Sequence, residues 1–448
     1  MSSGLTDTRR RDEGRRIESV GRTETICVVG LGYVGLPLAV HFDRVDQQVI
    51  GYDIDDEKVD TLTEGTDTTG DLGDAAVADS EVEFTTDPAT IADADYVIVT
   101  VPTPVDEMEN PDLRFVESAG ETIGTHMTPE TTVILESTVF PGATRSVLAP
   151  VLEEASGLTA GEEFFVAYSP ERATPGDEKH GLRDVVKVVG ADDPAVLEDV
   201  ADLYERVVDA GVHRTSSLEA AEASKVVENV QRDLNIALMN ELAIAFEHIG
   251  INTQEVLDAA GTKWNFHDYS PGLVGGHCIP VDPFYFAYRS KMEGYVPELT
   301  LKARDVNRRM PEHVSELALK TLNDCGNVLG ESRVVVLGLT YKPNVADTRT
   351  SVVDGVIDTM KEYGVDVLGF DPYADPEQTS QQFGIDVMDQ PSFEGADGIV
   401  LATPHDVFEN LDLAAAREVM NDDPFLFDVR GALDAEEVVG HGFTYRRV

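Results

Sequence analysis

The feature that most constrains this chain is a glycine-rich turn between an apolar run and a helical pattern. The run Thr25–Val29 ends in Gly30-x-Gly32-x-x-Gly35, and helical spacing follows over residues 34–42. The first glycine permits a tight turn, the second lets the backbone approach a pyrophosphate, and the third allows close helix–strand packing. The helix N-terminus adds partial positive charge. The pattern therefore predicts a dinucleotide site on a strand–turn–helix unit.

An acidic residue then indicates which dinucleotide binds. The second predicted strand, Gln48–Tyr52, is followed by Asp53, 18 residues after Gly35. A carboxylate in this place accepts hydrogen bonds from ribose hydroxyls and repels a 2′-phosphate. The sequence therefore favours NAD over NADP.

The strand pattern continues beyond this unit. Apolar runs at 96–101, 132–135, 164–168 and 185–189 are separated mostly by helix-length segments. Strands that alternate with helices are typical of a parallel, doubly wound sheet. We expect this first domain to end near residue 211.

The middle of the chain has a different character. Residues 217–262 look helical throughout, with one long helix over 218–249 that ends near Gly250. A second helix is expected over 297–309. The segment 263–296 between them is rich in Gly, Pro and aromatic residues and is predicted to be a loop.

The last third of the chain repeats the pattern of strand-like apolar runs seen in the first third. The runs at 333–338, 365–371 and 396–404 correspond to the early strands, but the three-glycine turn is replaced by Gly338-Leu339-Thr340-Tyr341-Lys342-Pro343-Asn344, which suggests another ligand. The predicted fold is α/β, with two Rossmann-like doubly wound parallel-sheet domains joined by a central helical domain with a long helix. The expected parts are a disordered tail (1–22), an NAD domain (23–211), a helical dimerisation and catalytic domain (212–312), and a third domain (313–448).

Charge narrows the class of partner. The chain has 34 basic and 84 acidic residues, a net charge of −50, spread along its whole length. Nucleic acid is disfavoured because phosphate binding needs a basic surface. Such a charge is best tolerated where salt screens self-repulsion, so we interpret the protein as halophilic, with an ordinary acidic protein as the alternative.

Cysteine usage and hydropathy point to a cytoplasmic protein. Cys27, Cys278 and Cys325 are too few and too scattered for a disulfide framework or a zinc site, so we expect no metal. No apolar stretch approaches the ~18 residues of a membrane span, and the N-terminal residues lack the apolar run of a signal peptide.

Cys278 is the candidate nucleophile. It lies in Gly275-Gly276-His277-Cys278-Ile279-Pro280-Val281-Asp282-Pro283. A single alcohol oxidation needs no thiol, whereas oxidation through an aldehyde to an acid benefits from one that holds the aldehyde covalently. The alternative is a buried core cysteine. The paired glycines favour close ligand approach, and His277 is interpreted as shaping the loop.

A helical pair accompanies this loop. Lys225 and Asn229 are four residues apart on the central helix and share one face. Taken alone, a solvated helix lysine is the simpler reading of Lys225. Asp282 is four residues beyond Cys278, on what we expect to be the same loop.

These motifs together resemble the UDP-glucose/GDP-mannose dehydrogenase family. The similarity runs from about Thr25 to the C-terminus through GLGYVGLPLA, VPTP, ESTVFPGAT, SPERATPGD, EASKVVEN, GGHCIPVDP, VNRRMP and YKPNVADTRTS. The resemblance implies an NAD domain, a helical core that forms a homodimer or higher oligomer, and a C-terminal nucleotide-sugar domain.

The resemblance also implies roles for residues. Cys278 forms thiohemiacetal and thioester intermediates, Lys225 and Asn229 stabilise the C6 oxygen, and Lys225 near Cys278 is expected to lower the thiol pKa. Asp282 supports Lys225 or the hydrolytic water. The remaining implied residues are Glu171 and Thr138 for that water, Tyr33, Val34, Thr103, Thr138 and Arg349 for the cofactor, and Glu171, Arg172, Gly276, Lys342 and Arg430 for the substrate.

The oxidised sugar follows less directly. UDP-glucose enzymes of the family usually carry Lys-Asp after the cysteine loop, but here Val281 takes the place of the lysine. The run 271–278, with Ser169-Pro170-Glu171-Arg172, is similar to the UDP-N-acetylhexosamine branch. We expect UDP-N-acetylglucosamine, with UDP-N-acetylmannosamine second and UDP-glucose third.

Two other classes of function stay open. A single-step dehydrogenase of the hydroxyacid or 6-phosphogluconate type shares the first domain but needs neither Cys278 nor a third domain. A catalytically inactive sugar-nucleotide sensor needs no reactive residues. Cofactor stoichiometry separates the three classes, at two, one or no NADH per sugar.

Overall fold

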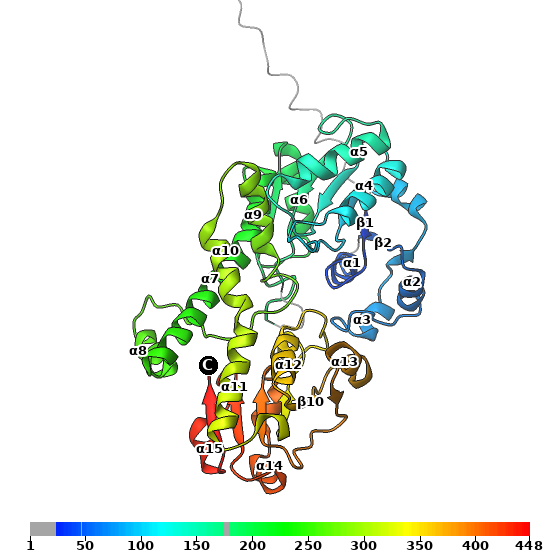
Figure 1. The fold of residues 1–448 in the computed structure, drawn as a ribbon. Helices are drawn as coiled ribbons and strands as arrows, with labels where there is room; N and C mark the ends of the chain where they lie inside the picture. Colours follow the sequence, from blue (N-terminus) through cyan, green and yellow to red (C-terminus); the bar gives the residue numbers. More distant parts are fainter. Residues whose placement is uncertain (1–23, 46, 174–178) are drawn as a thin grey trace, which may run out of the picture. The chain divides into compact units, whose positions relative to one another are not determined.

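The computed structural model describes residues 24–45, 47–173 and 179–448, which form two compact units. The first unit comprises the described residues up to Thr103 together with Leu113–Glu222, and the second comprises Pro104–Asp112 and Ala223–Val448. The predicted disordered tail lies outside the described residues. Figure 1 colours the chain from blue at the first strand to red at the C-terminus.

An eight-stranded sheet in the order β3-β2-β1-β4-β5-β6-β7-β8 forms the centre of the first unit. Its six inner strands are buried almost throughout, as in sheets covered on both faces, whereas the edge strands β3 and β8 are partly exposed. They are β1 (Thr25–Val29), β2 (Gln48–Tyr52), β3 (Glu83–Thr85), β4 (Tyr96–Val99), β5 (Thr132–Leu135), β6 (Phe165–Tyr168), β7 (Lys187–Ala191) and β8 (Val212–Arg214).

Helices complete this unit, and four of them, α1, α2, α3 and α6, contribute to one apolar core with the sheet. That core contains Leu36 and Val40 of α1 and Val200 and Leu203 of α6. The helices are α1 (Gly35–Asp43), α2 (Asp56–Thr63), α3 (Asp74–Ala78), α4 (Arg114–His126), α5 (Ala149–Ser156) and α6 (Pro194–Glu205).

One strand runs against the predicted direction. β7 pairs with β6 in antiparallel register, Ala167 opposite Ala191, whereas a wholly parallel sheet was expected. A parallel pair needs a long crossover, usually a helix, whereas an antiparallel pair does not. The described residues of the connection between β6 and β7 contain no helix.

The second unit begins within the long helix and ends in a six-stranded sheet. Helix α7 spans Leu218–Ile249, as predicted, and Gly250 follows it with φ of 77°. The sheet order is β11-β10-β9-β12-β13-β14, and every pair is parallel. Its strands are β9 (Arg333–Leu337), β10 (Asp366–Phe370), β11 (Asp386–Val387), β12 (Gly398–Leu401), β13 (Phe425–Asp428) and β14 (Thr444–Arg447).

Two separate cores cover the faces of this sheet. One core joins the strands to Val314 and Leu317 of α11 and to Val356 of α12, and the other joins them to Leu413 of α14 and Val438 of α15. The helices are α8 (Thr253–Gly261), α9 (Asp282–Met292), α10 (Glu298–Arg308), α11 (Met310–Asp324), α12 (Val353–Glu362), α13 (Pro376–Phe383), α14 (Leu413–Val419) and α15 (Ala435–Gly440).

The two sheets confirm the predicted duplication. In both, the first two strands of the repeat lie centrally and the fourth strand returns to the other side of the first, giving the order 3-2-1-4. The chain reverses direction across the sheet between β1 and β4, and again between β9 and β12. Such a switch point is where open α/β sheets bind ligands.

The sequence analysis predicted a loop over residues 263–296, but part of this segment is helical. Helix α9 begins at Asp282, with Pro283 in its first turn and basic residues in its last. Proline in a first turn loses no needed N–H and favours helical φ, so it starts this helix and does not break it. Asp282 is therefore fixed on a helix end, not on the flexible part of the cysteine loop.

Candidate active site

The glycine turn has the geometry that its sequence predicts. Gly30 has φ of 94°, and a Cβ on Gly35 would lie 1.9 Å from the Gly30 carbonyl oxygen. The first glycine therefore serves the turn and the third serves close packing of α1. A Cβ on Gly32 would meet nothing within 4 Å, so the middle of the turn faces open space. This open backbone at a helix N-terminus fits a dinucleotide pyrophosphate.

Asp53 lies at the end of β2, but its carboxylate is partly occupied. Oδ2 accepts from the backbone N–H of Leu31 at 2.8 Å and from Lys58 Nζ at 2.7 Å, and Oδ1 accepts from Asp55 N–H at 3.1 Å. A carboxylate offers about four acceptor positions, so capacity for a ribose hydroxyl remains. Lys58 brings a positive charge that the sequence analysis did not anticipate, and it weakens the expected repulsion of a 2′-phosphate.

The other predicted residues of this unit follow neighbouring strands. Thr103 comes after β4, Thr138 after β5 and Glu171 after β6, and the three strands are adjacent and parallel. They therefore share one edge of the sheet with the glycine turn and Asp53. This edge is the place where the first unit could hold NAD.

Glu171 is held by a buried charged cluster that the sequence analysis missed. Its Oε1 accepts from the N–H groups of Arg172 and Ala173, and its Oε2 lies 3.7 Å from Lys187 Nζ. Lys187 is 2% exposed and also pairs with buried Glu136 at 3.0 Å. Arg172, predicted to bind substrate, donates to the Val186 carbonyl at 2.5 Å. A lysine within a buried strand run was the only signal of this cluster.

The second unit brings Lys225, Asn229 and Asp282 together. Asn229 Nδ2 donates to Asp282 Oδ2 at 2.6 Å, and both residues are buried. Burial raises the pKa of Asp282 to about 6, although the charge of half-buried Lys225 and the hydrogen bond from Asn229 oppose the rise. The charge of Lys225 thus acts on the Asp282 carboxylate, and its role at the site stays a prediction.

Cys278 is the exposed thiol of the three cysteines. Its carbonyl accepts from the backbone N–H of Asp282 at 2.9 Å, which ties the loop to the start of α9. The surrounding protein partly desolvates the thiol and raises its pKa, and the Asp282 carboxylate adds to the rise. Lys225 lowers the pKa of Cys278, as expected, but is outweighed. The expectation of a lowered thiol pKa was therefore wrong.

The paired glycines of the loop serve a contact within the chain. A Cβ on Gly275 would lie 2.7 Å from the Thr350 carbonyl oxygen, and one on Gly276 would lie 2.9 Å from the Tyr341 ring. The close approach that they allow is thus made by the 341–350 segment, not only by a ligand. His277 Nε2 lies 3.0 Å from Asp347 Oδ2 and fastens the same two segments together.

A second set of buried polar residues on α7 also escaped the sequence analysis. Asp233 accepts from Arg304 and Asn307 of α10, and Asn240 accepts from Gly272 N–H at 2.7 Å and donates to its carbonyl at 3.1 Å. Gly272 begins the approach to the cysteine loop. The available signal was a polar stripe on α7, because Asn229, Asp233 and Asn240 are spaced by four and seven residues.

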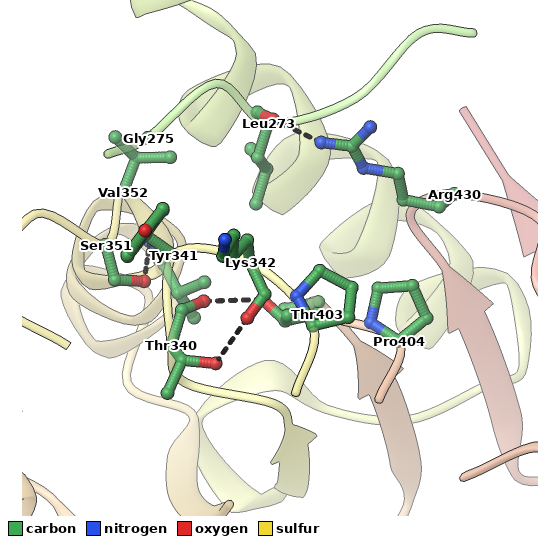
Figure 2. Close-up of a pocket in the computed structure, with 13 residues that line it drawn as sticks. Leu273, Gly275, Thr340, Tyr341, Lys342, Ser351, Val352, Thr403, Pro404 and Arg430 are labelled. Atoms are coloured by element: carbon green, nitrogen blue, oxygen red, sulfur yellow. Dashed lines mark hydrogen bonds between the residues drawn. The ribbon is translucent and has the colours of Figure 1, made fainter. Parts of the chain in front are cut away.

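A pocket of about 290 Å³ lies next to this loop in the second unit. Figure 2 shows Lys342, Thr403 and Pro404 on one side and Arg430 on another. Arg430 donates to the Leu273 carbonyl at 2.7 Å. Arg349, also predicted to contact ligands, pairs with Asp347 at 2.8 Å and does not line this pocket.

The predicted residues therefore fall into two groups. Cys278, Lys225, Asn229 and Asp282 belong to the second unit, which also carries the pocket with Lys342 and Arg430. The glycine turn, Asp53, Thr103, Thr138 and Glu171 belong to the first. Within residues 24–45, 47–173 and 179–448 there is no cluster of metal-ligating side chains, and no helix is long and apolar enough to cross a membrane.

Three domains of one known family match successive parts of the chain. Residues 24–208 match the NAD binding domain of the UDP-glucose/GDP-mannose dehydrogenase family, residues 219–309 its central domain, and residues 335–435 its UDP binding domain.

Relatives match over nearly the whole length. The chain is 44% identical to protein CapL of Staphylococcus aureus, covering 92% of this chain and 97% of CapL. It is 42% identical to the UDP-N-acetyl-D-glucosamine 6-dehydrogenase of Pseudomonas aeruginosa, covering 92% and 98%. The solved UDP-D-ManNAc dehydrogenase of Pyrococcus horikoshii superposes with a TM-score of 0.85 at 30% identity, covering 95% and 99%.

The raised pKa of Asp282 predicts an unusual dependence of stability on pH. An unfolded aspartate titrates near about 3.9, so the folded state holds this proton more strongly, and the free energy of unfolding falls as pH rises from about 4 to about 6. Asp282→Asn lacks this titration. We expect denaturant unfolding to show the variant more stable by up to about 3 kcal/mol above pH 7, with the difference vanishing below about pH 4.

Asp268→Asn is the matched control, because Asp268 is exposed on the segment that precedes the cysteine loop. It should change stability little at any pH. An Asp282→Asn protein less stable than the wild type at pH 7.5 would contradict a costly buried carboxylate.

Proposed function

Because the chain belongs to the UDP-glucose/GDP-mannose dehydrogenase family and is thus an NAD-dependent nucleotide-sugar dehydrogenase, we propose that it oxidises the C6 hydroxyl of UDP-N-acetylglucosamine to a carboxylate. The observation that carries the proposal is an exposed Cys278 four residues before Asp282, a buried carboxyl that accepts from Asn229 and on which the charge of Lys225 acts. A thiol in this place is useful only if an aldehyde must be retained for a second oxidation.

Relatives and one residue support the choice of sugar. Identity is 42% to an enzyme named for UDP-N-acetyl-D-glucosamine and 30% to one named for UDP-D-ManNAc. Val281 stands where UDP-glucose enzymes usually carry lysine. UDP-N-acetylmannosamine and UDP-glucose are the alternative substrates.

The chemistry at C6 uses the second unit's own residues. When bound, NAD supplies the hydride acceptor for two successive oxidations. Cys278 Sγ adds to the aldehyde carbon, its proton passing to the carbonyl oxygen, and oxidation of this thiohemiacetal leaves a thioester. Water then breaks the C–S bond, which releases the carboxylate and restores the thiol. Splitting the reaction in this way keeps the aldehyde from escaping.

Lys225 and Asn229 stabilise the C6 oxygen while it carries developing negative charge. An amide nitrogen has two hydrogens, and Asn229 uses one of them on Asp282, so the other is available to substrate. Preorganised donors of this kind usually make the largest contribution to catalysis. Lys225, whose charge already acts on Cys278 and Asp282, also exchanges protons with the C6 oxygen.

The nucleotide binds in the pocket of the second unit. Lys342 and Arg430 line it and bring two positive charges to a chain of net charge −50, which suits a diphosphate. Gly276 belongs to the adjoining loop. The roles of Thr138, Glu171, Arg172 and Arg349 stay predictions from the family resemblance.

The first unit binds NAD through the glycine turn with Tyr33 and Val34, together with Asp53 and Thr103. We propose domain boundaries near residues 211 and 312, and the extents of the three family matches support them. Because NAD and a free catalytic thiol suit a reducing compartment, we assign the protein to the cytoplasm, with a role in polysaccharide biosynthesis.

A homodimer through α7 is part of the proposal. Val227, Leu238 and Ile249 are about half exposed or more, and their spacing of eleven residues places them on one face of the helix. Such a stripe suits a second copy of α7. Sedimentation at molar salt tests the assembly, because a species with the 48.7 kDa mass of a single chain would contradict it.

The nucleophile is tested by counting product. With saturating NAD and UDP-N-acetylglucosamine in high salt, we expect two NADH per sugar from the wild type. Cys278→Ala should lose on the order of 10³-fold or more in kcat, because the covalent step has no substitute. UDP-N-acetylmannosamine and UDP-glucose are assayed in parallel to fix the preferred sugar.

Cys325→Ala is the control, since Cys325 is a partly exposed cysteine that packs beside the core of the C-terminal sheet, and it should keep wild-type stoichiometry. One NADH per sugar with an active Cys278→Ala variant would move the protein to the single-oxidation class. No NADH with any sugar would favour a sensor.

Salt dependence follows from charge. The net charge of −50 makes the acidic side chains repel one another. The Debye length, over which this repulsion acts, is about 30 Å at 0.01 M salt but only about 3 Å at 1 M. We therefore propose a halophilic protein whose melting temperature and activity both rise between low and molar KCl. Full activity and an unchanged melting temperature after dialysis to low salt would contradict this.

A further inference from the structure

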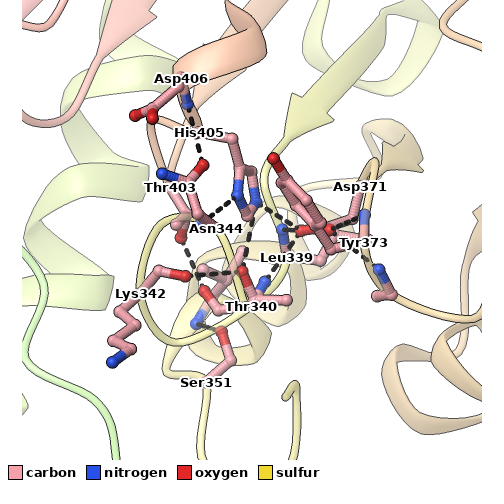
Figure 3. A network of polar contacts seen from close by, with 12 residues as sticks. Leu339, Thr340, Lys342, Asn344, Ser351, Asp371, Tyr373, Thr403, His405 and Asp406 are labelled. Atoms are coloured by element: carbon pink, nitrogen blue, oxygen red, sulfur yellow. Dashed lines mark hydrogen bonds and ion pairs between the residues drawn. The ribbon is translucent and has the colours of Figure 1, made fainter. Parts of the chain in front are cut away.

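One buried histidine of the second unit has no role in the chemistry above. His405 follows β12 and is 1% exposed. Its Nδ1 receives a hydrogen bond from the backbone N–H of Asn344 at 2.8 Å, and its Nε2 lies 2.9 Å from Asp371 Oδ2 and 3.2 Å from Thr340 Oγ1. Figure 3 shows these contacts reaching the ring from two other segments of the chain, 340–344 and the one that carries Asp371.

The contacts define which ring nitrogen carries the proton. A backbone N–H can only donate, so Nδ1 of His405 must accept from Asn344. The hydrogen of the neutral ring is therefore on Nε2, where it donates to the Asp371 carboxylate. Tyr373 and Phe408 pack on the ring, with centroids 5.0 and 5.5 Å away, and hold its orientation.

Comparison of the two repeats shows what the imidazole replaces. Asp53 and Asp371 both follow the second strand of their repeat, and each accepts from the N–H of the residue after the first glycine, Leu31 or Leu339. Asp53 also accepts from Asp55 N–H and from the partly exposed Lys58, and it keeps acceptor capacity for a ligand. Asp371 instead accepts a hydrogen bond from His405. The imidazole thus takes the place that a ribose hydroxyl would have beside this carboxylate.

The same imidazole fastens the segment 340–344, which carries Lys342. At one end of the segment, the Thr403 hydroxyl donates to the Thr340 carbonyl at 2.7 Å. At the other end, Asn344 has φ of 61°, donates to His405, and accepts from Asp406 N–H at 3.1 Å. The Lys342 side chain points away from this network in Figure 3 and lines the pocket.

We propose that His405 is a positioning residue for the nucleotide of the substrate. It binds Asp371 and Asn344 at once, and thereby holds the 340–344 segment in the shape that presents Lys342 to the diphosphate. The inference rests on the proposed function, because it takes the pocket to be the UDP site.

Two substitutions separate the two ring contacts. His405→Asn keeps an acceptor near the position of Nδ1 for Asn344, whereas His405→Gln keeps a donor near the position of Nε2 for Asp371. His405→Ala removes both. His441→Ala is the control for loss of a histidine, because His441 is exposed after α15.

Calorimetric UDP binding and steady-state KM values give the readout. We expect His405→Ala to weaken UDP binding by about 10-fold or more and to raise KM for the UDP-sugar, with kcat and KM for NAD within about two-fold of wild type. His405→Asn should recover most of the UDP affinity and His405→Gln little of it, because the Asn344 contact holds the segment.

The outcomes distinguish the inference from the proposed function. A wild-type protein that binds no UDP overturns both. A second outcome overturns the inference alone. In it, the wild type binds UDP, Lys342→Ala weakens that binding, and His405→Ala leaves it unchanged. Equal behaviour of the Asn and Gln variants, or a matching rise in KM for NAD, also overturns it. If His405→Ala fails to fold, the Asn and Gln pair carries the test.

Discussion

The segment that carries Cys278 depends on two buried asparagines of one helix. The Asn240 side chain of α7 hydrogen-bonds to both the backbone N–H and the carbonyl of Gly272. Asn229 of the same helix donates to Asp282, where α9 begins. The two asparagines are eleven residues apart, about 16 Å along the helix. The nine residues between Gly272 and Asp282 are therefore held at both ends by one rigid helix. These two anchors limit where the Cys278 thiol can lie.

The same helix shows how polar groups can be buried without destabilising a core. Asp233, between the two asparagines, is paired with Arg304 and also accepts from Asn307. A buried charge with a partner and additional hydrogen bonds costs far less than an isolated one. This interaction locks α10 onto α7, so the reactive loop and the helices around it form one support.

The duplicated sheets illustrate how one topology serves two ligands. Both repeats place an aspartate at the end of the second strand and use it to cap the first turn. In the first repeat, Gly32 leaves the turn open, as a pyrophosphate requires. In the second, Thr340 and Lys342 fill the corresponding stretch, and His405 covers the aspartate. The two sites therefore differ in the side chains that follow the strands, while the order of the strands is the same.

Much of this arrangement could be predicted from the sequence. The strands at 25–29, 48–52 and 132–135 and the helix at 218–249 lie where the apolar patterns indicate, because each is set by local periodicity. Helix α9 was missed because Gly, Pro and aromatic residues masked its start. The antiparallel β7, the contact that Gly275 and Gly276 make with residues 341–350, and the buried Lys187 all depend on segments distant in sequence. The direction of the Cys278 pKa shift was missed for the same reason, since burial of the thiol, with the Asp282 carboxylate, outweighs Lys225 only in the folded arrangement.

That raised pKa has a consequence for the durability of the enzyme. Peroxide and other oxidants attack the thiolate, and a thiol that stays protonated is attacked slowly. Cys278 is the most accessible of the three cysteines, yet burial and the Asp282 carboxylate keep its sulfur protonated while no substrate is bound. The raised pKa thus slows oxidation of the proposed nucleophile between turnovers. Burial of the sulfur, with the carboxylate beside it, favours the protonated thiol that oxidants attack slowly.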